Sequence, residues 1–360
     1  MHRETHGGSM SGVPFCRDNH YTPCVYLRGF AGPGKRIFAY RTLVPRTEVP
    51  LWKPSSTRGV GYLSHLYTRI AAGQETDEIE TWLKRDFEDP AAEPLRKAIS
   101  GERLTTKDWT CLISFLAAQI VRTPAFFVKN VPRWQADAQP LLNSVVRESV
   151  QRLEAAKKSG HPLQPPQGVY SEYLPVRVAA QIEPGKEGAT LKAAVVVGRG
   201  YWLFAMRRLL AGSAAKALHE NQWSILAPYE GLSWFTSDAP VILLNYHADG
   251  KYDFNGGWGS HGSEILLPLG PGHLLYTHIG YRPPQRGMVL PRNQTESIRR
   301  FIAEHAYRMI FAASPENSVS GWRPRTVNDE LFHQEQGQWR TWHVDQTGAE
   351  KGLMDTSRSL

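Results

Sequence analysis

The spacing of apolar residues changes once along this chain, and that change constrains the fold more than any other feature. Between residues 77 and 158, apolar side chains recur every three or four positions, as on one face of a helix. After residue 220 the apolar stretches are short, rich in β-branched and aromatic residues, and separated by turns such as Gly270-Pro271-Gly272. This order predicts an α+β protein, in which an N-terminal helical half packs on a mostly antiparallel C-terminal sheet.

The same patterns give approximate element boundaries. Helices are expected over residues 77–88, 91–99, 133–158, 200–219 and 295–312, and a further one is expected to begin near Thr106 and to end at Arg122-Thr123-Pro124. Strands are expected over residues 37–40, 223–227, 233–236, 241–245, 264–269 and 273–279.

Loop-like segments divide the chain into three parts. Residues 1–17 are polar and rich in Gly and Ser, which predicts a disordered lead-in. Residues 18–312 are expected to form one integrated α+β domain, with a helical part at 18–160 and a sheet-rich part at 168–312, joined by a stretch rich in Pro, Gly and Gln. Residues 313–360 are rich in Trp but lack a period, so we expect an irregular tail.

Composition narrows the class of protein. Hydrophobic residues make up 41% and charged residues 21% of the chain, which is typical of a folded protein. The net charge of +8 is compatible with nucleic acid or another anionic partner, but the basic residues are scattered rather than clustered, which favours a solvated basic surface. Three cysteines and the lack of a long apolar run favour a cytoplasmic protein that does not enter a membrane.

Two polar residues stand out on the otherwise apolar helix that ends near residue 122. Gln119 and Arg122 lie three positions apart, so both are expected on the same side of the helix close to its C-terminus. A guanidinium at this position can cap the last carbonyls or form an internal ion pair. It can also clamp a carboxylate or phosphate of a ligand, and the sequence leaves these alternatives open.

Carboxylates and one histidine supply further candidates. Glu80 and Glu88 lie on the first helix and can share a face, where a solvated acidic surface is the alternative. Asp238 follows Thr236-Ser237 at the end of a strand, where it can bind backbone amides, a metal or a proton. His20 sits beside a turn and can act as a general base or as a structural hydrogen-bonding group.

These residues occur within a longer pattern of motifs. The chain opens with His20-Tyr21-Thr22-Pro23, Tyr26-Leu27-Arg28-Gly29-Phe30 and Gly34-Lys35-Arg36-Ile37-Phe38-Ala39-Tyr40, and continues with Glu80-Thr81-Trp82-Leu83, Glu88, Gln119-x-x-Arg122-Thr123-Pro124 and Phe235-Thr236-Ser237-Asp238. Over residues 18–312, this order of motifs resembles a bacterial family of unknown function. The resemblance implies a single domain. It also implies that the recurring polar positions, His20, Glu80, Glu88, Gln119, Arg122 and Asp238, are candidates for one cleft.

Two classes of function follow from these candidates. The first is a metal-assisted hydrolase, such as a nuclease in a toxin or phage-defence setting. Its catalytic residues would be His20, Arg122 and Asp238, its binding residues Gln119 and Tyr21, and its ligands for Mg²⁺ or Mn²⁺ Glu80, Glu88 and Asp238. The second is a module without chemistry that binds nucleic acid or a protein through aromatic and basic side chains.

Overall fold

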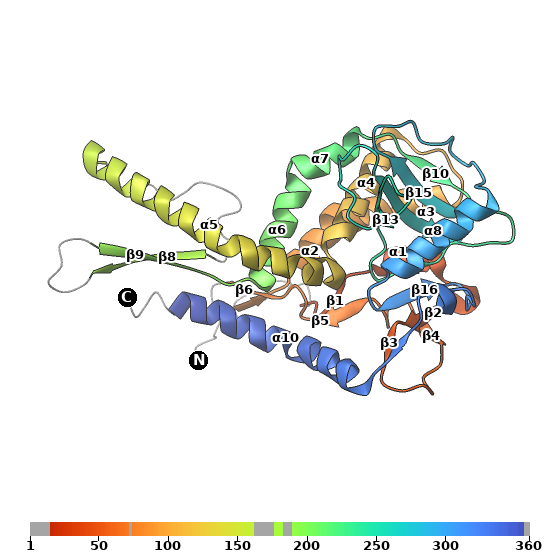
Figure 1. The fold of residues 1–360 in the computed structure, drawn as a ribbon, viewed down its shortest axis with the longest axis horizontal. Helices are drawn as coiled ribbons and strands as arrows, with labels where there is room; N and C mark the ends of the chain where they lie inside the picture. Colours follow the sequence, from red (N-terminus) through yellow and green to blue (C-terminus); the bar gives the residue numbers. More distant parts are fainter. Residues whose placement is uncertain (1–14, 72–73, 162–175, 183–188, 356–360) are drawn as a thin grey trace, which may run out of the picture.

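Five of the strands after residue 220 build an antiparallel sheet in the globular part of the molecule (Figure 1). The computed structural model describes residues 15–71, 74–161, 176–182 and 189–355. The strand order in this sheet is β10-β15-β14-β12-β13. The strands are β10 (Ser224–Leu226), β12 (Ile242–Tyr246), β13 (Tyr252–Asp253), β14 (Glu264–Gly270) and β15 (His273–His278).

Both faces of this sheet are apolar and both are covered by helices. Side chains alternate along a strand, so neighbouring residues of β14 point to opposite faces. Ile265 and Leu267 pack with residues of helix α4 (Thr106–Val121), whereas Leu266 packs with residues of helix α8 (Arg292–His305). The sheet is therefore the middle layer of a core with a helix on each side.

A second sheet joins the two ends of the domain. Its order is β11-β16-β2-β4, and all of its pairings are antiparallel. The strands are β2 (Arg36–Arg41), β4 (Trp52–Ser56), β11 (Thr236–Ser237) and β16 (Met309–Ala312). The prediction of a helix over residues 295–312 is thus wrong at its end, because residues 309–312 form the strand that pairs with β2.

Helices form most of residues 78–220. Besides α4 they are α2 (Glu78–Leu83), the π-helical turn η3 (Lys84–Glu88), α3 (Asp89–Ile99), α5 (Pro124–Ser159), α6 (Arg199–Ala211) and α7 (Ser213–Glu220). The helix predicted from residue 133 begins earlier, at Pro124, whose fixed φ suits the first turn and whose missing N–H needs no partner there. The helix predicted over 200–219 is two helices that meet at Gly212.

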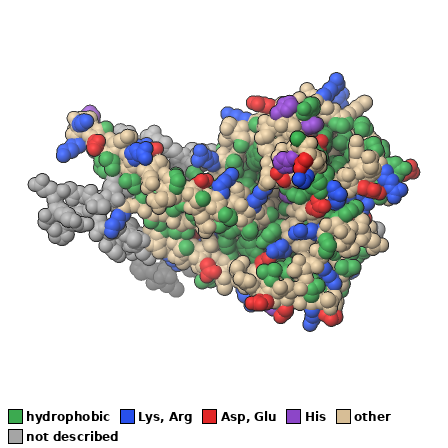
Figure 2. Space-filling model, viewed as in Figure 1, with side chains coloured by type: hydrophobic (Ala, Val, Ile, Leu, Met, Phe, Trp, Pro, Cys, Tyr) green, Lys and Arg blue, Asp and Glu red, His purple; other side chains and the backbone are tan. Residues whose placement is uncertain are grey.

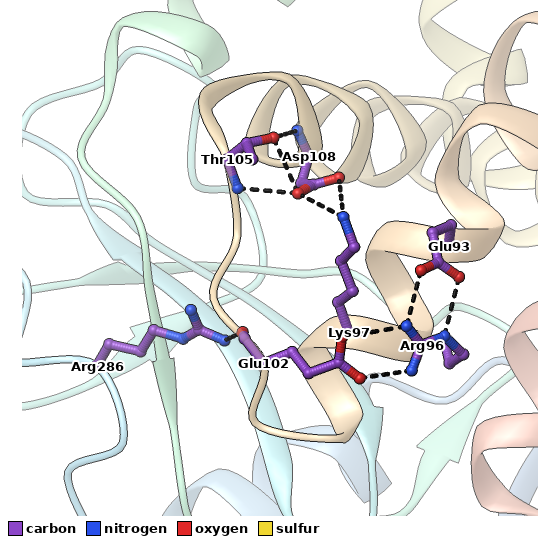
Figure 3. Close-up of polar contacts among 7 residues, drawn as sticks. All are labelled: Glu93, Arg96, Lys97, Glu102, Thr105, Asp108 and Arg286. Carbon is purple, nitrogen blue, oxygen red and sulfur yellow. Dashed lines mark hydrogen bonds and ion pairs between the residues drawn. The ribbon is translucent and has the colours of Figure 1, made fainter.

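Helix α4 begins with a reciprocal cap, one residue before the predicted position (Figure 3). The Thr105 hydroxyl accepts the amide of Asp108, and the Asp108 carboxylate accepts the amide of Thr105 at 2.8 Å. Lys97 donates to the same carboxylate, which ties α3 to the start of α4. The arrangement satisfies amides that would otherwise lack a partner, so it holds the orientation of α4 beneath the sheet.

Short elements complete the domain. They are α1 (Cys24–Leu27), η1 (Arg28–Phe30), η2 (Pro33–Lys35), α9 (Val319–Trp322), and the paired strands β1 (Asp18–His20) with β5 (Tyr62–Ser64), β3 (Leu43–Val44) with β17 (Thr326–Val327), β6 (Arg69–Ala71) with β7 (Gln74–Thr76), and β8 (Val176–Ile182) with β9 (Ala189–Val195). The far half of α5 and the β8–β9 hairpin lie side by side and extend away from the globular part (Figure 1).

The prediction of an irregular C-terminal tail is wrong, because Asp329–Asp355 form helix α10. Trp339 and Trp342 pack into the cluster of apolar side chains that also contains Trp202. The buried guanidinium of Arg199 donates to both carboxylate oxygens of Glu350 on this helix, at 3.0 and 2.6 Å. The few apolar positions of α10 explain why no helical period was visible in the sequence.

These elements confirm the α+β class, with helices packed on mostly antiparallel sheets. The predicted lead-in and the predicted linker at 160–168 fall largely outside the described residues. No single helix in the described part of the chain has the length and apolar composition needed to cross a membrane; only α4 and α5 taken together do, and they are bent by 59°.

Candidate functional site

Four of the predicted site residues meet at the end of α4, in what we call the Arg122 cluster: His20, Glu80, Glu88 and Arg122. Arg122 is fully buried and occupies the C-cap of α4. Its Nη1 donates to Glu88 Oε1 at 2.7 Å, and its Nη2 donates to the backbone carbonyl of His20 at 2.5 Å. Glu80 Oε2 lies 3.8 Å from Nη2. The prediction of an internal ion pair for Arg122 therefore describes the guanidinium better than a ligand clamp does.

Glu80 is the chemically unusual member of the Arg122 cluster. Its side chain is 14% exposed, and its Oε2 atom is buried without a hydrogen-bond partner in the described structure. Burial raises the pKa of Glu80 to about 7. The positive charge of Arg122 lowers this pKa and the negative charge of Glu88 raises it, but burial has the largest effect. Near neutral pH both protonation states of this carboxyl group are therefore populated, as a general acid or base requires.

The imidazole of His20 is directed elsewhere. Its Nε2 lies 3.3 Å from the carbonyl oxygen of Arg58, and only the backbone of His20 binds Arg122. Burial lowers the pKa of His20, so its ring is neutral at neutral pH. Tyr21, predicted to bind substrate, is 4% exposed and belongs to the apolar cluster around Trp202, so its side chain is not open to a ligand.

Asp238 has a structural role. Its Oδ1 accepts the amide of Tyr307 at 2.9 Å, and its Oδ2 accepts the amides of Arg308 and Met309 at 2.7 and 2.9 Å. The carboxylate thereby binds the turn that connects α8 to β16. Of the roles that the sequence left open for Asp238, binding of backbone amides is the observed one.

The predicted ligands for Mg²⁺ or Mn²⁺ do not fit a metal ion. Asp238 uses both oxygens on amides, and Glu88 is paired with the Arg122 guanidinium, which would repel a cation. Glu80, Glu88 and Asp238 do not converge on one point; in the described residues, the group of side chains with metal-ligand spacing is His65, Glu75 and His343.

This second group does not suit a metal ion either. Arg199 Nη1 lies 3.0 Å from His343 Nδ1, and because a guanidinium only donates, Nδ1 must be the acceptor. The proton of the neutral ring is then on Nε2, which donates to Glu75 Oε1 at 2.7 Å. With both nitrogens engaged, His343 has no lone pair for a metal, and we assign the group to the docking of α10.

Gln119 lies apart from Arg122 and lines a separate cavity of about 570 Å³, which we call the Gln119 cavity. Its walls come from the end of α4, the first turns of α5, α7, the start of β12, the loop at 254–259 and the end of α8. Figure 2 shows hydrophobic side chains open to view in the middle of this face of the globular part, with Lys and Arg side chains beside them. The volume is typical of small-molecule sites.

The carboxamide of Gln119 has no hydrogen-bond partner in the described structure, although the residue is only 1% exposed. A buried amide without a partner costs free energy, so such a group in a cavity wall indicates a position for a polar ligand atom or water. Asn130 offers a second amide, since its Nδ2 donates to the Phe126 carbonyl while its oxygen has a free lone pair. The cavity thus presents several polar contacts within an apolar lining.

The charged residues that line the Gln119 cavity have one sign. Lys129 and Arg133 stand at its exposed edge, and none of the residues that line it is Asp or Glu. His305 lines it as well; its Nδ1 lies 3.0 Å from the carbonyl of Ala239 and donates to it. Burial lowers the pKa of His305 to about 4, and Lys129 adds repulsion, so the ring is neutral and its Nε2 is an acceptor.

Sequence reasoning identified Gln119 but not Lys129, Asn130 or His305. The expected helix started at residue 133, so Lys129 and Asn130 fell outside it, and His305 lies inside the helix expected over residues 295–312 without a motif that marks it. The sequence signal that could have located these residues is Arg122-Thr123-Pro124, which predicted the end of a helix. Proline is also favoured in the first turn of a helix, so Pro124 can begin a new helix whose first turns lie close to Gln119.

The fold and the site define an α+β protein with a cavity of about 570 Å³ beside its main sheet. The chain belongs to the family described as Protein of unknown function (DUF4238), whose model matches residues 18–316. This confirms the resemblance that the motifs indicated and places α10 beyond the matched region. No curated protein and no solved structure matches the chain.

Proposed function

We propose that this protein binds a small organic anion in the Gln119 cavity. The observation that carries the proposal is the carboxamide of Gln119, which has no partner among the described residues and lies in the wall of a cavity lined by the charged residues Lys129 and Arg133. An anionic group of the ligand would lie near these two cations, and polar ligand atoms would contact Gln119 and Asn130. The apolar lining would hold the remainder of the molecule.

The size of the cavity favours a ligand with the dimensions of a mononucleotide over a nucleic-acid polymer. Isothermal titration calorimetry with adenosine 5′-monophosphate and with adenosine tests the charge requirement, because the two probes differ only in the phosphate. We expect the monophosphate to bind at least about tenfold more tightly. Equal affinities, or no binding of either probe, would contradict the proposal.

Two variants test the position of the ligand. Lys129→Met removes one cation at the edge, and Gln119→Leu replaces the buried carboxamide by an apolar side chain of similar size. Each is expected to weaken binding of the monophosphate about tenfold or more, while Lys216→Met, an exposed lysine of α7 outside the cavity lining, is the matched control. Unchanged affinity in both cavity variants would place any binding elsewhere.

A second candidate function is hydrolysis at the Arg122 cluster, and the pKa of about 7 for Glu80 favours it. This hypothesis differs from the metal-assisted hydrolase that the sequence suggested. Glu80 would transfer the proton without a metal ion, because the predicted carboxylate ligands do not fit one. Cleavage of bis(p-nitrophenyl) phosphate or single-stranded DNA, assayed with Mg²⁺ and with EDTA, tests it. We expect activity that resists EDTA and is lost in Glu80→Gln; an inactive wild-type protein would eliminate this candidate.

A further inference from the structure

A second pocket lies on the other face of the main sheet, against α8. We call it the Glu264 pocket, and its volume is about 570 Å³. Tyr276 from β15 and Glu264 from β14 line it, as do Tyr246 from β12 and Arg300 from α8. The side chains of Leu266 and its neighbours on this face belong to the α8 side of the core, so the sheet separates this pocket from the Gln119 cavity.

Two tyrosines hold the Glu264 carboxylate in a fixed position. Tyr276 Oη donates to Glu264 Oε1 at 2.9 Å, and Tyr246 Oη donates to Glu264 Oε2 at 3.2 Å. Each tyrosine hydroxyl occupies one lone pair of the carboxylate oxygen to which it donates. Each carboxylate oxygen can therefore still accept a second hydrogen bond. The carboxylate is therefore oriented on the pocket wall but not saturated.

The negative charge of Glu264 has no counter-charge within the described chain. No Lys, Arg or His of that part of the protein forms an ion pair with Glu264, which is only partly exposed. Arg300 lines the same pocket, but its Nε lies 3.6 Å from Glu304 Oε1, and its guanidinium stacks 5.6 Å from the ring centre of Tyr252. The positive charge of Arg300 is thus already balanced by Glu304, whereas the negative charge of Glu264 is not balanced by a cation in the described residues.

Aromatic rings surround the uncompensated carboxylate. Besides Tyr246 and Tyr276, Tyr252 and Phe301 line the pocket, with their ring centres 4.6 Å apart. Tyr246 is 47% exposed, which leaves the entrance open to solvent. Aromatic faces beside a carboxylate attract cations, and they favour cations with alkyl groups that gain from contact with the rings.

We propose that the Glu264 pocket binds an organic ammonium cation. The carboxylate of Glu264 supplies the counter-charge, the rings of Tyr246 and Tyr276 contact the alkyl groups on the nitrogen, and the apolar side chains of Met288 and Leu290 border the rest of the ligand. This site is independent of the Gln119 cavity, which lies on the opposite face of the sheet and attracts the opposite charge.

Calorimetric titration with choline and with its neutral isostere 3,3-dimethyl-1-butanol tests the proposal, since the two differ in the charge and share their shape. We expect choline to bind at least about tenfold more tightly than the alcohol. Glu264→Gln keeps the shape of the side chain and should weaken choline binding at least about tenfold. Choline that does not bind, or that binds no better than the alcohol, would overturn the proposal.

Controls separate a binding effect from a folding effect. Tyr246→Ala removes an exposed ring and should weaken choline binding, whereas Tyr246→Phe keeps the ring and should retain most of the affinity. Glu296→Gln, an exposed carboxylate of α8 outside the pocket lining, should bind choline as the wild type does. An unchanged affinity in both Glu264→Gln and Tyr246→Ala would refute the assignment. Gln119→Leu should leave choline binding intact, which distinguishes this site from the proposed anion site.

Discussion

Glu80 makes the stability of the protein depend on pH in a way that a single substitution reveals. In the folded protein its pKa is about 7, compared with 4.5 for an unperturbed glutamate. Below pH 4.5 the carboxyl group is protonated in both the folded and the unfolded state. As the pH rises from 4.5 to 7, the unfolded chain loses this proton while the folded protein keeps it, so the folded state becomes less favourable.

The size of this effect follows from the two pKa values. The difference between 4.5 and about 7 corresponds to a loss of about 3 kcal/mol in the free energy of unfolding. Glu80→Gln cannot ionise, so the variant should lack this loss. We therefore expect the free energy of unfolding of the wild type, minus that of Glu80→Gln, to fall by about 3 kcal/mol between about pH 4 and pH 8.

Urea denaturation followed by tryptophan fluorescence at a series of pH values measures this difference. The exposed Glu230, changed to Gln, is the matched control, because its removal takes away a charge without removing a buried carboxyl group. Parallel pH dependence of the wild type and Glu80→Gln would refute the reasoning. It would show that Glu80 is ionised throughout this range and that Arg122 fully compensates its burial.

Three further predictions concern stability, measured by urea or thermal unfolding. Asp238→Ala leaves three backbone amides without an acceptor and should cost about 3 kcal/mol or more, with a smaller loss in Asp238→Asn; equal losses would contradict this role. Glu350→Ala leaves the buried Arg199 without its carboxylate and should cost about 3 to 5 kcal/mol, whereas a change below about 1 kcal/mol would mean that α10 is only loosely attached. Thr105→Ala removes one half of the cap shared with Asp108 and should cost about 1 kcal/mol; a neutral result would indicate that water replaces the hydroxyl.

Local signals in the sequence were sufficient for α2, α3 and α4. The apolar period locates α4 between its N-cap and Pro124, because capping residues and proline act within one turn of their own position. Four strands of the main sheet, β10, β12, β14 and β15, were also predictable, since alternation and Gly-Pro turns are local features. For these elements the pattern and the tertiary structure agree.

Elements that depend on distant contacts were not predictable. Apolar spacing continues from α8 into residues 309–312, yet the helix ends at His305. The reason is Asp238, which binds the amides of Tyr307, Arg308 and Met309 and so competes with helical hydrogen bonding there. A single sequence gives no sign that these two segments meet.

The site shows the same division. Gln119 and Arg122 are three residues apart, and this spacing predicted that they share one side of the helix. They nevertheless enter different environments, because α4 ends between them and α5 departs at an angle of 59°. The partners that decide their roles, Glu88 for Arg122 and the cavity wall for Gln119, come from other parts of the chain.

The place of β2 in its sheet has a consequence for how the chain is made. This strand lies between β4, which follows it closely, and β16, in which Met309 pairs with Arg41. One edge of β2 therefore remains open until nearly all of the domain has left the ribosome, and pairing that bridges such long sequence separations is slow. We expect this sheet to complete only once β16 has left the ribosome, and fragments that end before β16 to aggregate through that open edge.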